Sequence, residues 1–300
     1  MTGVTAYRAL RTPRHEIRRV RGLDTHLTHW GPPPTEADPA VFLLHGWQDT
    51  GDTFQFLVDG FREDRPFVAL DWRGFGRSEV PQDGYWFADY LADLEDLLDQ
   101  LSPGVPARLV GHSMGGNIAS LYAGVRPERV QCIVNLEGFG LPRTSTGDAP
   151  AQMRKWLNQI KASPVLKNYD SFEQLCSIVA MRYPRFSPAQ ADFVTRAWSR
   201  LGDDGRVHLL GDPRHRRDSP TLYHREDVEV ICRQIRAPML LLLARHSEYL
   251  ARLGADGSDG ALREMFSTGE IVYVENAGHM LHIERADVVA PLVESFLSTH

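Results

Sequence analysis

The chain has 300 residues, of which 42% are hydrophobic, which allows one large α/β domain or two small ones. Its formal net charge of −6 argues against a surface that binds nucleic acid. No apolar run approaches the roughly 20 residues that span a membrane, and the first residues lack the apolar segment of a signal peptide.

The cysteines and histidines predict neither disulfides nor a metal site. Cys132, Cys176 and Cys232 lie in apolar or helical patterns without a C-x-x-C pair, which is typical of reduced core residues in a cytoplasmic protein. The histidines show no H-x-H or H-x-x-x-H spacing of the kind that zinc sites use. We therefore expect no metal. The sequence carries no signal for a particular oligomeric state.

The first half of the chain alternates short apolar strands with helices. Residues 15–30 predict an antiparallel pair of strands that turns at Gly22. Further strands are predicted at 41–44, 67–70, 108–110 and 130–136, and helices at 53–61, 85–101 and 114–124. This alternation indicates a mostly parallel sheet with helices on both faces.

The alternation stops at Gly138 and resumes after about Glu226. Between them we expect helices at 152–161, 171–181 and 188–201, and no strand. Strands follow at 239–243 and 270–274, and helices at 260–266 and 280–297, which completes an eight-stranded sheet. An insertion of roughly 90 residues is too long for a loop. We interpret residues 139–226 as a helical cap on a core formed by 1–138 and 227–300.

Gly111-His112-Ser113-Met114-Gly115 matches the pattern G-x-S-x-G between a predicted strand and a predicted helix. A serine on such a tight turn projects its hydroxyl away from the sheet, and the flanking glycines prevent clashes at the bend. The start of the next helix offers unpaired backbone N–H groups to a developing oxyanion. The pattern therefore predicts that Ser113 is a nucleophile.

A serine nucleophile needs a base and an oxyanion hole. His279 follows the last predicted strand and so lies at the same sheet edge as Ser113; its alternative role is capping or packing. The backbone N–H groups of Met114 and Trp47 are our candidates for the oxyanion hole. His45 and His282 are interpreted as structural residues.

These motifs together resemble the α/β-hydrolase fold superfamily. His45-Gly46-Trp47 resembles its oxyanion loop, residues 71–78 (DWRGFGRS) resemble its D-x-R-G-x-G-x-S loop, and Gly278-His279 resembles its histidine loop. The resemblance covers the chain outside the cap. It implies structural roles for Asp71 and Arg73, a small-molecule substrate and no cofactor.

The third catalytic group departs from the superfamily's common pattern. Ser247 stands where the resemblance implies an aspartate, and Glu248 comes next. Glu137, at the end of the predicted strand 130–136, resembles the acid of some haloalkane dehalogenases in its position. A glutamate that ends an apolar strand needs a partner, because an unpaired buried charge is unfavourable. We favour Glu137 and keep Glu248 as the alternative; either residue has a purely structural alternative role.

The resemblance implies a serine hydrolase that acts on small to medium, largely apolar ester-like substrates through an acyl-enzyme. Hydrolysis of a carbon–carbon or thioester bond, perhydrolase activity, a cofactor-free lyase or oxygenase step, and a ligand-binding receptor remain alternatives. The side chains that we expect to line the pocket are Trp47, Trp72, His112 and Phe139, and cap aromatics such as Trp156, Tyr183 and Phe186 are further candidates.

Overall fold

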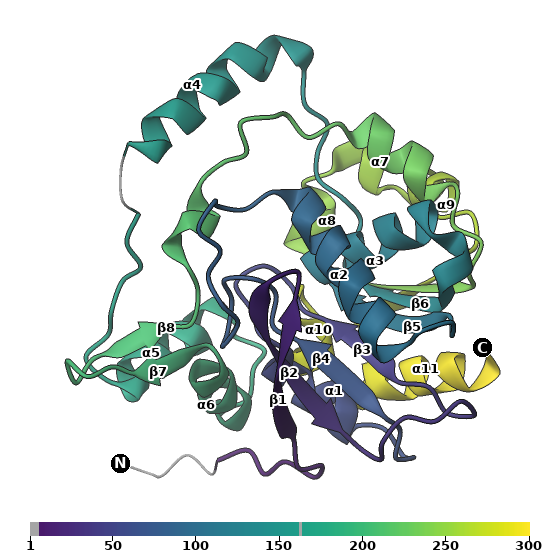
Figure 1. Ribbon diagram of the computed structural model, residues 1–300, viewed down its shortest axis with the longest axis horizontal. Helices are drawn as coiled ribbons and strands as arrows, with labels where there is room; N and C mark the ends of the chain where they lie inside the picture. The colour runs from purple at the N-terminus through teal and green to yellow at the C-terminus, as the bar shows by residue number, and fades with distance from the viewer. Residues whose placement is uncertain (1–5, 162–163) are drawn as a thin grey trace.

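An eight-stranded sheet forms the centre of the computed structural model, which describes residues 6–161 and 164–300 (Figure 1). Its strand order is β1-β2-β4-β3-β5-β6-β9-β10. The strands are β1 (Arg14–Val20), β2 (Leu23–Trp30), β3 (Val41–Leu44), β4 (Phe67–Leu70), β5 (Ala107–His112), β6 (Val130–Leu136), β9 (Met239–Ala244) and β10 (Gly269–Val274).

The sheet is parallel from β4 to β10, whereas β1 and β2 pair antiparallel at one edge. All residues of β3, β4 and β9 are buried, because both faces of these strands are covered. The carboxyl ends of the parallel strands meet at one edge of the sheet, where open α/β sheets bind ligands. The predicted fold class, a mostly parallel eight-stranded sheet, is confirmed.

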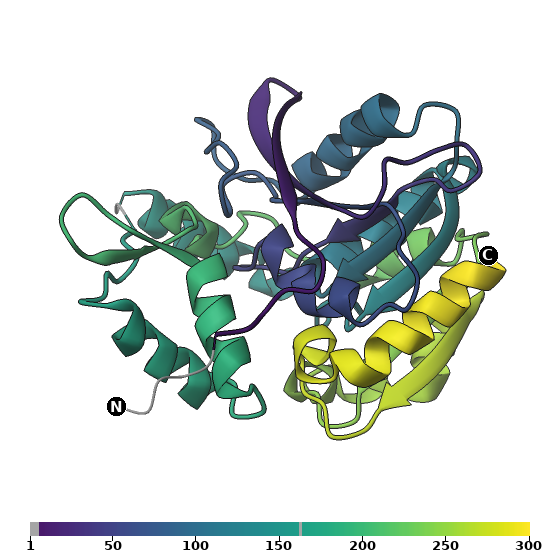
Figure 2. The same cartoon turned by 90° about the horizontal axis from the view of Figure 1, so that it is seen from below.

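Helices cover both faces of the sheet (Figure 2). One face packs against α2 (Phe87–Leu101), α3 (Met114–Val125), α7 (Arg225–Cys232) and α9 (Asp259–Met265). The other face packs against α1 (Gln55–Asp59) and α11 (Ala286–Thr299). The predicted helix 280–297 is divided into α10 (Leu281–Glu284) and α11, because Arg285 leaves helical geometry at φ −134° and ψ 44°.

The segment inserted between β6 and α7 contains α4 (Ala149–Ile160), α5 (Phe172–Arg182) and α6 (Pro188–Ala197). It also contains a two-stranded hairpin, β7 (Ser199–Leu201) and β8 (Val207–Leu209). The expectation of no strand here was therefore wrong, and the predicted helix 188–201 ends at Ala197. Strands of three residues are too short for periodicity to distinguish them from a helix end.

The inserted segment contacts the sheet edge at several points. The backbone N–H of Gly76 donates to Leu210 O at 3.1 Å, and the N–H of Asp212 donates to Gly74 O at 2.8 Å. Helix α4 stands apart from the sheet (Figure 1) and has no buried residue. Within the described ranges, no helix is long and apolar enough to cross a membrane.

Candidate active site

Ser113 lies on the turn between β5 and α3. Its backbone has φ 52° and ψ −113°, a conformation that non-glycine residues rarely adopt. Its N–H donates to Leu136 O at 2.8 Å, which fixes the turn against β6. At Gly115 a Cβ would collide with Leu44 O, so the glycine lets α3 approach β3 closely. The turn therefore holds the Ser113 side chain at the carboxyl end of the sheet.

His279 lies in the loop between β10 and α10, and its ring faces Ser113. Its Nε2 atom is 3.0 Å from Ser113 Oγ. The loop is held by the N–H of Gly278, which donates to Glu284 Oε2 at 2.5 Å. The Tyr249 ring covers the imidazole, with ring centroids 4.2 Å apart. With 18% of its side chain exposed, His279 is shielded yet reachable from solvent.

Glu137 directly follows β6 and lies on the other side of the His279 ring. Its Oε2 atom is 3.1 Å from His279 Nδ1, and its side chain has no exposed surface. The Ala244 N–H donates to Oε1 at 2.7 Å, and the Ser247 hydroxyl donates to Oε2. Because a carboxylate only accepts hydrogen bonds, Nδ1 carries the proton and Nε2 accepts from Ser113. The structure thus joins Ser113, His279 and Glu137 in one hydrogen-bonded chain.

Glu248, the alternative acid, lies away from this chain of contacts. It is the first residue of α8 (Glu248–Ala251), 84% of its side chain is exposed, and it pairs with Arg252 at 4.0 Å. Ser247 caps α8 by accepting from the Leu250 N–H at 3.2 Å. The serine at the position of the common acid therefore contacts Glu137 itself. This supporting role was not predicted from the sequence; the neighbouring ends of strands β6 and β9 are the signal that could have indicated it.

The loop after β3 approaches the turn that carries Ser113. A Cβ at Gly46 would lie 3.2 Å from Ser113 Cβ, so a larger residue would displace the turn. Trp47 follows, and 48% of it is exposed. Met114 is the first residue of α3, so its N–H has no acceptor within the helix. Both predicted oxyanion donors therefore belong to segments adjacent to Ser113.

His45 anchors this loop. Its Nδ1–H donates to Gly46 O at 2.7 Å, and its Nε2 accepts from the Trp72 N–H at 2.9 Å. Burial lowers the pKa of His45, so its imidazole is neutral near pH 7. Both ring nitrogens of His45 form hydrogen bonds to backbone groups, which agrees with a structural role.

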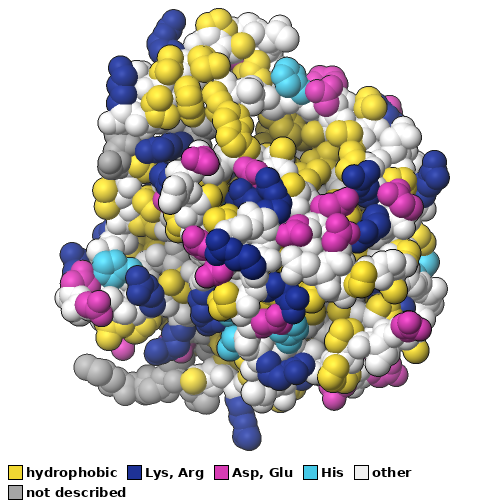
Figure 3. Space-filling model, viewed as in Figure 1, with side chains coloured by type: hydrophobic (Ala, Val, Ile, Leu, Met, Phe, Trp, Pro, Cys, Tyr) yellow, Lys and Arg dark blue, Asp and Glu magenta, His cyan; other side chains and the backbone are white. Residues whose placement is uncertain are grey.

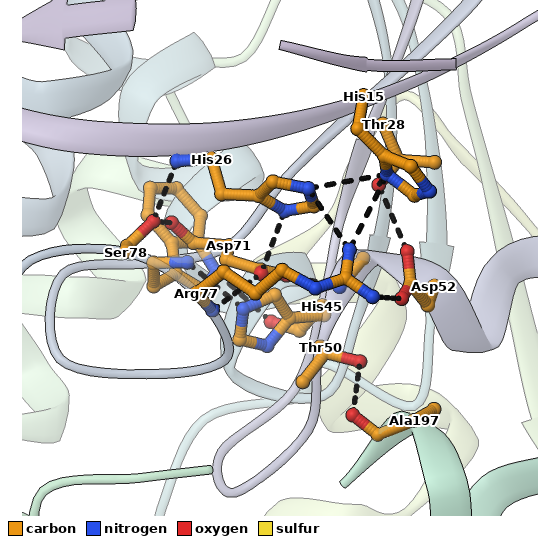
Figure 4. Close-up of polar contacts among 12 residues, drawn as sticks. His15, His26, Thr28, His45, Thr50, Asp52, Asp71, Arg77, Ser78 and Ala197 are labelled. Carbon is orange, nitrogen blue, oxygen red and sulfur yellow. Dashed lines mark hydrogen bonds and ion pairs between the residues drawn. The ribbon is translucent and has the colours of Figure 1, made fainter. Parts of the chain in front are cut away.

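Asp71 connects this loop to the β1–β2 hairpin (Figure 4). Its Oδ1 accepts from the Gly51 N–H at 2.7 Å, and its Oδ2 accepts from His26 Nδ1 and from the Arg77 N–H, each at 2.9 Å. Despite burial, these bonds hold the pKa of Asp71 below its usual range. Arg73 forms a buried, two-pronged ion pair with Asp93. Asp71 therefore connects the segments after β3 and β4 to β2, and Arg73 joins the loop after β4 to α2.

Three of the four residues that we expected to line a pocket lie in the protein interior. Trp72 has no exposed surface and donates through Nε1 to His45 O at 3.0 Å. His112 and Phe139 expose 1% and 3% of their surface. Trp47 is the exposed member of the set. The four residues lie at or just after the ends of β3, β4, β5 and β6, and their place in a substrate pocket stays a prediction.

The aromatic residues of the inserted segment have different surroundings. Phe186 is buried and stacks on Tyr183, with ring centroids 5.0 Å apart. Trp156 lies on α4 and is partly exposed. Trp198, which sequence analysis did not single out, donates through Nε1 to Asp49 Oδ1 at 2.6 Å. This bond connects the inserted segment to the loop after β3.

Comparisons with known proteins agree with the fold. Residues 39–175 match the family described as alpha/beta hydrolase fold. The "Serine hydrolase-like protein" of Danio rerio is 29% identical over 276 residues, which are 89% of this chain and 83% of that protein. The "sn-1-specific diacylglycerol lipase ABHD11" of Mus musculus is 30% identical over 271 residues, which are 87% of this chain and 81% of that protein.

Among solved structures, the "Thioesterase Domain From Curacin Biosynthetic Pathway" superposes with a TM-score of 0.83 at 23% identity. The match covers 95% of this chain and 99% of the domain. The chain belongs to the α/β-hydrolase fold family. Its sequence relatives support a hydrolase, and the structural neighbour supports the fold.

Proposed function

We propose that this protein is a serine hydrolase that cleaves ester-like bonds through an acyl-enzyme at Ser113. The observation that carries the proposal is the chain of contacts from Ser113 Oγ to His279 Nε2, 3.0 Å, and from His279 Nδ1 to Glu137 Oε2, 3.1 Å. These two contacts of His279 support the roles of nucleophile for Ser113, base for His279 and orienting acid for Glu137.

In the first half of the reaction, Ser113 Oγ attacks the substrate carbonyl carbon while its proton passes to His279 Nε2. Glu137 stabilises the resulting imidazolium and keeps the Nδ1 proton in place. The backbone N–H groups of Met114 and Trp47 receive the oxyanion of the tetrahedral intermediate. His279 then donates its Nε2 proton to the leaving alcohol, whose bond to the carbonyl carbon breaks.

In the second half, His279 removes a proton from water, and the resulting attack on the acyl carbon forms a second tetrahedral intermediate. Collapse of that intermediate returns the proton to Ser113 Oγ and releases the carboxylic acid. No cofactor takes part in this proposal.

We further propose that residues 139–226 form a cap over the site and that the substrate is a small to medium, largely apolar molecule. Apolar side chains gather on and beside α4 in Figure 3. Met153, Leu157 and Ile160 of α4 are between 41% and 44% exposed, and Leu141, earlier in the inserted segment, is 54% exposed. An exposed apolar surface of this kind on an inserted segment is typical of a region that contacts a ligand.

A graded series of p-nitrophenyl esters tests the proposal. We expect measurable kcat/KM with a maximum at one acyl length, and loss of nearly all activity in Ser113→Ala. Ser298→Ala, which changes an exposed serine of α11, serves as the control and should retain wild-type kcat/KM. Equal activity of wild type and Ser113→Ala would show that another group performs the hydrolysis.

A further inference from the structure

Three polar side chains meet in the interior beside the turn that carries Ser113. Asp49 comes from the loop after β3, His112 ends β5, and His282 lies in α10. One nitrogen or oxygen atom from each lies within 4.8 Å of the others. The three residues are 3%, 1% and 0% exposed. They are far apart in the sequence, so no residue spacing predicts that they meet.

Several atoms of these side chains have no hydrogen-bond partner among the described residues. They are Asp49 Oδ2, His112 Nδ1 and both ring nitrogens of His282. Buried polar atoms are almost always partnered in native proteins, so a convergent set of unpartnered atoms indicates that something binds between them. The proposed reaction uses none of these atoms.

The hydrogen bond made by His112 shows which of its ring nitrogens carries a lone pair. His112 Nε2 donates to the backbone oxygen of His279 at 2.8 Å, so Nδ1 is its acceptor. Imidazole binds a metal through such an unprotonated ring nitrogen.

The neighbours of Asp49 and His112 hold these residues in the manner of metal ligands. Asp49 Oδ1 accepts from the Thr50 N–H, Thr53 Oγ1 and Trp198 Nε1 at 2.8, 2.9 and 2.6 Å, whereas Oδ2 has no partner among the described residues. The bond from His112 Nε2 to a backbone carbonyl is the outer contact that orients most metal-binding histidines.

We propose that Asp49, His112 and His282 bind a divalent transition metal, with Zn²⁺ as the representative ion. Two imidazoles and one carboxylate are a common zinc donor set that leaves a fourth position open. Bonds of about 2.1 Å place tetrahedral ligand atoms about 3.4 Å apart, so small side-chain rotations from the present arrangement bring them into range. The competing occupant is a water molecule that donates to Asp49 and His112 and accepts from His282.

Such a metal would link the loop after β3, the end of β5 and helix α10 around Ser113. His112 directly precedes Ser113 and bonds the loop that carries His279, and Asp49 follows the predicted oxyanion loop. Because a ligand that binds only the folded chain stabilises it, zinc should raise the midpoint of thermal unfolding.

Equilibrium dialysis of metal-free protein against Zn²⁺, read by elemental analysis, tests the proposal, and Co²⁺ substitution adds the visible absorption of a tetrahedral site. We expect one metal per wild-type chain. Asp49→Asn and His282→Gln should each weaken zinc binding by at least tenfold. Loss of a residue that only hydrogen-bonds a metal ligand already lowers metal affinity by about 10–100-fold. His208→Gln is the matched control, because His208 forms a partly exposed pair with Asp204 at 2.8 Å. It should bind like wild type.

The result that overturns the proposal is wild-type protein that retains no more zinc than Asp49→Asn or His282→Gln, which would leave water as the occupant. Loss of binding in His208→Gln would also overturn it. Circular dichroism of the metal-free variants checks that they fold. Asp49 and His282 lie in different elements, so if one variant does not fold, the zinc content of the other is compared with that of wild type. Because the readout is metal content, the outcome is independent of ester hydrolysis.

Discussion

Replacing Glu137 with glutamine tests how the proposed acid controls His279. Three donors converge on the carboxylate: the Ala244 N–H, the Ser247 hydroxyl and His279 Nδ1. Glutamine keeps one acceptor oxygen and adds an NH₂ group. If the glutamine oxygen faces His279, its NH₂ group points at the Ala244 N–H, so two donors face each other. The orientation with the oxygen toward Ala244 and the NH₂ group toward His279 is therefore favoured.

In that orientation the NH₂ group donates to His279 Nδ1. The ring proton then moves to Nε2, which no longer accepts from Ser113. A histidine held in the wrong tautomer cannot act as the base, and in a serine protease the comparable change lowers kcat by about 10⁴-fold. We expect a similar fall in kcat/KM here, equivalent to about 5 kcal/mol of transition-state stabilisation.

The assay is kcat/KM for the best p-nitrophenyl ester, measured on variants whose circular dichroism matches wild type. Glu248→Gln is the control, and because 84% of the Glu248 side chain is exposed it should change kcat/KM by no more than about twofold. A folded Glu137→Gln variant within a few fold of wild type would refute the assignment of the acid. A larger loss in Glu248→Gln than in Glu137→Gln would refute it as well.

Two further predictions concern neighbours of the site. Ser247→Ala removes a donor to Glu137, and kcat/KM should fall roughly tenfold with little change in KM; an unchanged kcat would contradict this positioning role. His215 stacks between Phe75 and Tyr85, and burial lowers its pKa to about 4. As the pH falls, His215 is therefore protonated in the unfolded chain before it is protonated in the folded protein. The free energy of unfolding consequently falls between about pH 6.5 and pH 4. Between pH 7 and pH 5, the free energy of unfolding measured with urea should fall by about 2 kcal/mol less in His215→Gln than in wild type. Equal decreases in the two proteins would show that His215 does not cause this pH dependence.

The sequence predicts the sheet well because its central strands are continuous apolar runs. Residues 41–44, 67–70 and 239–243 contain almost no polar side chain, and the structure buries them all. It predicts the inserted segment less well. Ser199–Leu201 and Val207–Leu209 pair with each other through backbone bonds that a three-residue pattern does not reveal.

The sequence also places Ser113, His279 and Glu137 at strand ends on one edge of the sheet, where the structure brings them together. The sequence does not show that Ser247 bonds Glu137, because that contact depends on the register between β6 and β9 and on where each strand ends. Nor does it show that Asp49, His112 and His282 converge. Their meeting follows from the packing of a loop, a strand end and a helix, which residue spacing along the chain does not encode.

Covalent labelling shows whether Ser113 is the nucleophile. Folded protein is treated with a fluorophosphonate, and its intact mass and peptide map are measured. We predict one adduct per chain, located on Ser113, that is absent from Ser113→Ala and forms much more slowly in His279→Gln. Folded wild-type protein that forms no adduct, or an adduct that persists in Ser113→Ala, would show that Ser113 is not an activated nucleophile.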